Sequence, residues 1–123
     1  MKKITALCTF LLLTFTSYSQ ISPIGGKWWG ILDVGGRKLT IGFDINANEG
    51  QGFMEVKEQG AKGIPMDVRK VTADSLDILI SSIGASYSGI RVAQDKIDGT
   101  FTQSGMKLAL SLQPGAIPVN RPQ

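Results

Sequence analysis

Apolar and polar residues alternate along most of the chain, and the alternation is clearest between Arg37 and Ile45. In this run Leu39, Ile41, Phe43 and Ile45 are separated by Lys38, Thr40, Gly42 and Asp44. A period of two buries one face of a segment and exposes the other, which is typical of a β-strand. A similar run, Lys27 to Val34, comes before it. The Gly35-Gly36 pair between the runs predicts a two-residue hairpin, because tight hairpin turns need positive φ.

Six further runs of the same kind follow the first two. They cover Gly52–Glu58, Ile64–Val71, Ser75–Ser82, Ala85–Val92, Lys96–Gln103 and Met106–Leu112. Short connectors favour antiparallel pairing of successive strands, and a meander that closes on itself leaves no free strand edge. No segment carries a helical period over a useful length. The pattern therefore predicts an all-β fold: an eight-stranded antiparallel up-and-down β-barrel, lipocalin-like in architecture, with an open β-sandwich as the alternative.

The inward positions of these strands predict the core. They are Trp28, Leu32, Leu39, Ile41, Phe43, Ile45, Met54, Val56, Met66, Val68, Leu76, Ile78, Ile80, Tyr87, Ile97, Phe101, Leu108 and Leu110. A barrel of about eight strands has room for packed side chains or for one small ligand. For a ligand in the interior, the predicted binding residues are Trp28, Phe43, Met54, Met66, Tyr87 and Phe101.

The first 19 residues have the three regions of a secretory signal peptide. A basic start is followed by the apolar run Ile4 to Phe15, and small residues at Ser17 and Ser19 precede Gln20. The apolar run is shorter than the roughly 20 residues that a membrane-spanning helix needs. We expect cleavage after Ser19 and export to the periplasm or the exterior, with no membrane anchor remaining.

The expected organisation thus has three parts. Residues 1–19 are the signal peptide, residues 20–112 form the β-barrel domain, and residues 113–123 form a Pro-rich tail or linker. Prolines at 114, 118 and 122 favour an extended chain in this last part over a strand.

The mature chain is poor in reactive side chains. The sequence has no His, and Cys8, its one cysteine, lies in the signal peptide. No side chain with an ordinary pKa near neutrality remains, and neither does a thiol nucleophile or a soft metal ligand. Loss of Lys2 and Lys3 lowers the formal net charge from +3 to +1. We therefore expect no catalytic residue, no metal, no cofactor and no nucleic-acid partner.

Two motifs with possible chemistry favour structural interpretations. Gly84-Ala85-Ser86-Tyr87-Ser88-Gly89 departs from the nucleophile-elbow spacing, because Ser occupies position 88, and the chain has no His to act as its base. The carboxylate pairs are interpreted as surface charge at turns and strand edges. These pairs are Glu55 with Glu58 and Asp95 with Asp98.

Gly26-Lys27-Trp28 has the Gly-x-Trp form found in the first strand of lipocalin-type barrels, which it resembles at this one point. Lipocalins usually place an arginine in the last strand, whereas Met106–Leu112 offers only Lys107. The resemblance implies a stand-alone barrel that binds a small apolar ligand, which is an alternative function for this chain.

Five segments taken together carry a broader resemblance. They are Gly26–Leu32, Leu39–Ile45, Gln59–Pro65, Ile83–Gly89 and Asp98–Met106. The set resembles the N-terminal, non-catalytic β domain of secreted bacterial α/β hydrolases, esterase-like or peptidase-like. Asn120–Gln123 resembles the start of the linker into the hydrolase. The resemblance implies an accessory domain that partners an α/β hydrolase domain in cis or in trans and assists packing, substrate access or folding. The catalytic triad would then lie in a domain absent from this chain.

Overall fold

The eight predicted strands close into one antiparallel barrel in sequence order. The computed structural model describes residues 23–119, so the expected signal peptide lies outside the described residues. The strands are β1 (Gly26–Val34), β2 (Arg37–Asn46), β3 (Gln51–Val56), β4 (Ala61–Val71), β5 (Ser75–Ile80), β6 (Ala85–Ala93), β7 (Lys96–Gln103) and β8 (Met106–Pro114), with single 3₁₀ turns η1 (Lys57–Gln59) and η2 (Ser81–Ile83). β8 pairs with β1, which confirms the predicted barrel over the open sandwich.

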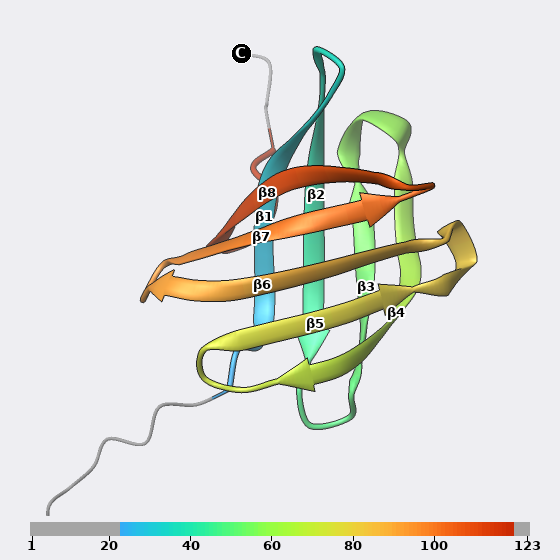
Figure 1. Cartoon of the computed structure of the whole chain (residues 1–123). Coiled ribbons are helices and arrows are strands. Elements are labelled where there is room, and N and C mark those ends of the chain that lie inside the picture. Colours follow the sequence, from blue (N-terminus) through green and yellow to red (C-terminus); the bar gives the residue numbers. More distant parts are fainter. Residues whose placement is uncertain (1–22, 120–123) are drawn as a thin grey trace, which may run out of the picture.

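The barrel has two halves whose strands cross. β1, β2, β3 and the start of β4 run up and down the view in Figure 1, whereas β5 to β8 run across it. β4 turns from one direction to the other, and its pairing with β5 shifts register between Val68 and Lys70. A local bulge of this kind bends a strand and increases its twist, which lets a small sheet close on itself.

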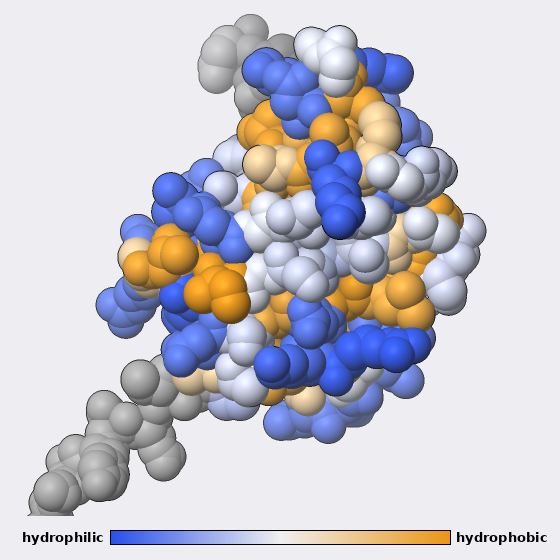
Figure 2. Space-filling model, viewed as in Figure 1, coloured by the Kyte–Doolittle hydropathy of each residue, from blue (hydrophilic) through white to orange (hydrophobic). Residues whose placement is uncertain are grey.

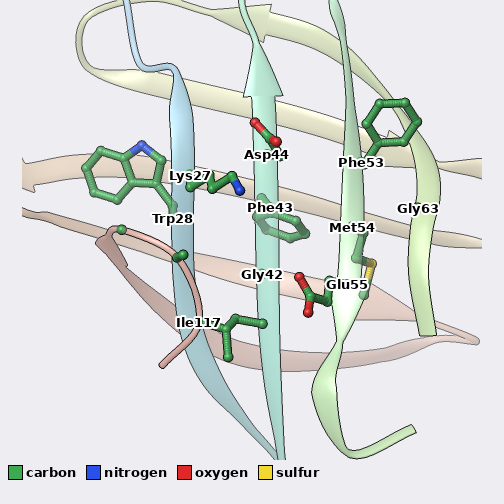
Figure 3. A pocket seen from close by; sticks show the side chains of 12 residues that line it. Lys27, Trp28, Gly42, Phe43, Asp44, Phe53, Met54, Glu55, Gly63 and Ile117 are labelled. Carbon is green, nitrogen blue, oxygen red and sulfur yellow. The ribbon is translucent and has the colours of Figure 1, made fainter. Parts of the chain in front are cut away.

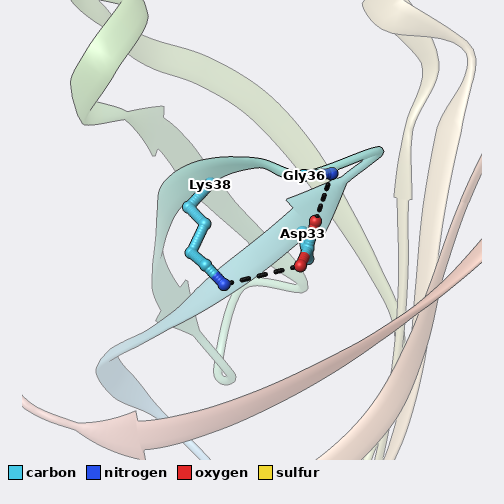
Figure 4. A network of polar contacts seen from close by, with 3 residues as sticks. All are labelled: Asp33, Gly36 and Lys38. Atoms are coloured by element: carbon cyan, nitrogen blue, oxygen red, sulfur yellow. Dashed lines mark hydrogen bonds and ion pairs between the residues drawn. The ribbon is translucent and has the colours of Figure 1, made fainter.

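The β1–β2 hairpin has the two-residue turn that the glycine pair predicts. Val34 pairs with Arg37, and Gly35 and Gly36 have φ values of 62° and 91°. Asp33 fastens the turn, as Figure 4 shows: its Oδ1 accepts a hydrogen bond from the Gly36 N–H at 2.8 Å. The Lys38 ammonium lies 3.5 Å from the other carboxylate oxygen. Asp33 thus contacts both the turn and the strand that follows it.

The predicted inward positions form the core. All of them are buried except Leu39 and Leu108, which are half-buried and pack against the core. Ile24, Ala85 and Leu112 are also buried, although the strand pattern did not select them. Leu112 continues the alternation of β8.

Tyr87 on β6 organises the middle of the core. Its hydroxyl donates a hydrogen bond to the Leu110 carbonyl at 2.8 Å, and its ring lies 5.4 Å from that of Phe43. The ring occupies the space above Gly99 on β7, where a Cβ would come within 2.5 Å of the Tyr87 hydroxyl. Burial raises the pKa of the phenol, and the negative charge of Asp98 adds to the effect.

Several strand bounds differ from the prediction. β4 begins three residues early, at Ala61, and the other differences are of one or two residues. β3 and β5 stop two residues early, at Val56 and Ile80, because the single turns η1 and η2 follow them. β8 continues two residues past its expected end at Leu112, to Pro114, which pairs with Trp28.

The segment after β8 lies against the outside of the barrel. The Gly115 N–H donates to the Lys27 carbonyl at 2.7 Å, and the Lys57 ammonium donates to the Pro118 carbonyl at 3.2 Å. Between these points Ile117 covers Gly42, where a Cβ would meet its side chain at 2.8 Å. The segment thus runs across the outer faces of β1 and β2.

We expect Tyr87→Phe to lower the free energy of unfolding at pH 7 by about 1–2 kcal/mol, because it leaves the buried Leu110 carbonyl without its hydroxyl partner. Urea unfolding followed by tryptophan fluorescence measures this change. Ser88→Ala, which removes an exposed hydroxyl bonded to Asp77, is the control and should change stability by no more than about 0.5 kcal/mol. Equal effects of the two substitutions would contradict the structural role of Tyr87.

Candidate ligand-binding site

One end of the barrel is closed by packed side chains. Trp28 lies there with its indole N–H donating to the Gly25 carbonyl at 3.0 Å. The Arg91 guanidinium lies 5.5 Å from the centre of the Trp28 ring, a cation–π arrangement, and donates to the Gln94 carbonyl at 2.8 Å. The last strand, β8, contains no arginine. The arginine that covers Trp28 comes instead from β6.

The other end of the barrel is open. The β1–β2 hairpin, η1, η2 and the β7–β8 turn meet around it, at the upper right of Figure 1. They surround a cavity of about 320 Å³, within the lower range of ligand pockets. Its apolar lining consists of Leu32, Val34, Leu39, Ile41, Met54, Val56, Ile64, Ile83, Phe101, Met106 and Leu108, and its polar lining of Arg37, Gln59 and Gln103.

The predicted ligand-binding residues divide between this cavity and the packed part of the barrel. Met54 and Phe101 line the cavity. The other four are buried in the core and do not line it; they are Trp28, Phe43, Met66 and Tyr87. The interior is therefore filled towards the closed end and hollow towards the open end.

Several cavity residues were missed by the sequence pattern. Arg37 lies two residues from Leu39, and Gln103 lies two residues from Phe101, so both point to the inner face of their strands. The period-two pattern could therefore have identified them. Gln59 and Ile83 lie in the 3₁₀ turns, which no periodicity marked. The Gln103 amide donates to the Ile83 carbonyl at 3.0 Å and joins β7 to η2 across the mouth.

Glu58 holds η1 against β2. One carboxylate oxygen accepts the Thr40 backbone N–H and the other accepts the Thr40 hydroxyl, each at 2.6 Å. The interpretation of Glu58 as surface charge was incomplete. The side chain is exposed, but it hydrogen-bonds Thr40 of β2, next to Ile41, where the pairing of β2 with β3 ends. The hydrogen bonds from Thr40, above all that of its hydroxyl, lower the pKa of the Glu58 carboxyl below its ordinary 4.5. This clamp positions Gln59 at the mouth.

A second hollow lies on the outside of the barrel, in the groove shown in Figure 3. It measures about 130 Å³ and is bordered by the charged side chains of Lys27, Asp44 and Glu55. Ile117 of the C-terminal segment reaches into it over Gly42. We therefore interpret this groove as the place where the C-terminal segment packs, and not as a ligand site. It is also smaller and more polar than the cavity at the open end.

The surface shows apolar side chains among hydrophilic ones, with one group near the top of the view and another at the left edge (Figure 2).

Among residues 23–119 no group of three or more His, Cys, Asp or Glu side chains is placed to hold a metal ion. Over the same range there is no helix with the length and apolar character to cross a bilayer.

Comparison with known proteins gave no match: no family model, no curated protein and no solved structure is significantly similar to the chain. The resemblance to hydrolase N-terminal domains and to lipocalins therefore remains a prediction from the segments quoted above.

The Glu58 clamp predicts an acid-dependent stability. The folded state holds the pKa of Glu58 below its unfolded value, so the carboxylate stabilises the fold above about pH 4.5, and this contribution disappears as the pH falls through the folded value. Glu58→Gln should therefore lower the melting temperature at pH 7, and its difference from the wild type should shrink as the pH falls below 4.5, as measured by circular dichroism.

Glu55→Gln is the matched control for this measurement, because Glu55 lies on the adjacent strand and makes no hydrogen bond to Thr40. A Glu58→Gln variant that melts like the wild type at pH 7 would show that the clamp does not stabilise η1.

Proposed function

We propose that this protein is a non-catalytic, exported binding barrel that takes a small apolar molecule, or the apolar part of a larger one, into its open end. The cavity carries this proposal: eleven of its lining side chains are apolar, and three are polar. Moving apolar surface from water into such a lining is favourable by about 25 cal/mol per Å².

The volume of the cavity limits the size of the ligand. At roughly 30 Å³ for a group the size of water, a space of about 320 Å³ accommodates about ten non-hydrogen atoms. Ile41, Met54 and Phe101 lie deepest by their positions on the strands, and the half-buried Leu39 and Leu108 lie nearer the mouth. A linear molecule entering at the mouth would place its apolar end against the first three.

The chemistry of the lining favours binding over catalysis. It contains one guanidinium and two amides, but no carboxylate, hydroxyl, thiol or imidazole. Enzymes that use nucleophilic or general acid–base catalysis rely mainly on carboxylate, hydroxyl, thiol and imidazole groups. The composition of the mature sequence, without His or Cys, supports the same inference.

We expect the protein to bind 1-octanol, and Leu108→Trp to weaken this binding at least about tenfold by filling the cavity near its mouth. Isothermal titration calorimetry measures the affinity, and circular dichroism checks that the variant is folded. Ile90→Trp adds the same bulk to a site on β6 that is 55% exposed, and should bind like the wild type.

Backbone NMR locates the ligand in the same titration. Signals from Val34, Ile64 and Ile83 should shift, whereas those from Ile24 and Trp28 at the closed end should not. Absence of binding, or shifts confined to the outer groove, would contradict a site in the barrel.

A second candidate function is that of an accessory domain to an exported α/β hydrolase. One observation favours it: each of the five segments that carry this resemblance contributes at least one side chain to the cavity. The contributors are Leu32, Leu39, Ile64, Ile83 and Phe101, among others. In this proposal the open end faces the hydrolase domain and receives an apolar side chain from it or a substrate passing towards it.

The reading frame beyond codon 123 and the adjacent genes test the accessory role. We expect a hydrolase domain in one of these places, and we expect the purified barrel to retain that domain in a pull-down. Leu108→Trp should weaken retention if the open end is the contact surface. A stop codon with no hydrolase gene nearby would contradict this function and leave ligand binding as the proposal.

A further inference from the structure

We propose that the open end selects amphipathic anions, in which a carboxylate group sits at the mouth beside Arg37 and an apolar chain fills the cavity. The inference rests on the proposed binding function and adds a head-group preference to it. Its starting observation is that Arg37 is the one charged side chain in the lining of the cavity.

The fold directs Arg37 towards the mouth. Arg37 shares its strand parity with Leu39 and Ile41, whose side chains line the cavity. It directly follows the Gly35-Gly36 turn, so its backbone belongs to the hairpin that Asp33 fastens (Figure 4). A cation at an inward position at the rim of an apolar cavity has no evident role in packing the core.

Nearby carboxylates are already engaged with other groups. Asp33 accepts the Gly36 N–H and lies beside the Lys38 ammonium, and Glu58 accepts both bonds from Thr40. Arg37 takes part in neither of the ion pairs found among residues 23–119. The positive charge at the mouth is therefore left without a neutralising side chain in the cavity lining.

An arginine suits a carboxylate ligand in particular. Its planar guanidinium offers parallel N–H groups that can bind both oxygens of a carboxylate, and these charge-assisted bonds are stronger than bonds between neutral groups. The amide N–H groups of Gln59, also at the mouth, can add a donor. With about ten non-hydrogen atoms as the limit of the cavity, the octanoate ion is a suitable probe.

The test compares octanoate, 1-octanol and octylammonium by calorimetry at pH 7 and low salt. The wild type should bind octanoate most tightly and octylammonium least tightly. Arg37→Gln should weaken octanoate binding about five- to tenfold and change octanol binding less than about twofold. Added salt should weaken octanoate binding in the wild type but not in Arg37→Gln.

Lys107→Gln is the matched control, because Lys107 lies at the same end of the barrel but has outward parity on β8. It should leave the affinity for all three probes unchanged within about twofold. Circular dichroism confirms that both variants fold.

Two results distinguish a failure of anion selection from a failure of the proposed binding function. If octanol binds as tightly as octanoate, or if Arg37→Gln weakens both equally, anion selection is overturned while apolar binding stands. If the wild type binds none of the three probes, the proposed binding function fails, and the inference fails with it.

Discussion

The placement of the large side chains inside the barrel determines where the interior is filled. Tyr87 spans the core between the Leu110 carbonyl and the ring of Phe43, and it occupies the space that Gly99 leaves free. Trp28 and Arg91 fill the end beyond it. The opposite end is lined mainly by aliphatic side chains that do not meet across the barrel, and a cavity remains there. The open site thus follows from an uneven distribution of aromatic residues along one barrel axis.

Strand alternation was sufficient to predict the barrel and nearly all of its core. It missed the buried Ile24, Ala85 and Leu112. Among the residues it selected, Leu39 and Leu108 are the two that are only half-buried, and both line the cavity at the open end. They are half-buried because the interior there has no side chains to cover them completely. A period of two shows which way a side chain points, but it cannot show whether the space in front of it is filled.

The binding site was less predictable than the fold. Met54 and Phe101 are large, apolar and inward, so the strand pattern selects them. Arg37 and Gln103 also point inward, but a search for apolar positions does not select polar side chains. Gln59 and Ile83 reach the mouth through single 3₁₀ turns, whose formation depends on tertiary contacts such as the Glu58 clamp. The meeting of four connections at one opening is a property of closure, and no local pattern encodes it.

The path of the C-terminal segment affects how a second domain could be joined to the barrel. From Pro114 at the closed end it doubles back along the outer wall, and Pro118 is held by Lys57 of η1, next to the opening. The chain direction at this point therefore leads away from the barrel on the side of the cavity rather than from the sealed end. A domain tethered there would need only a short connection to face the opening, and its effective concentration at the mouth would be high.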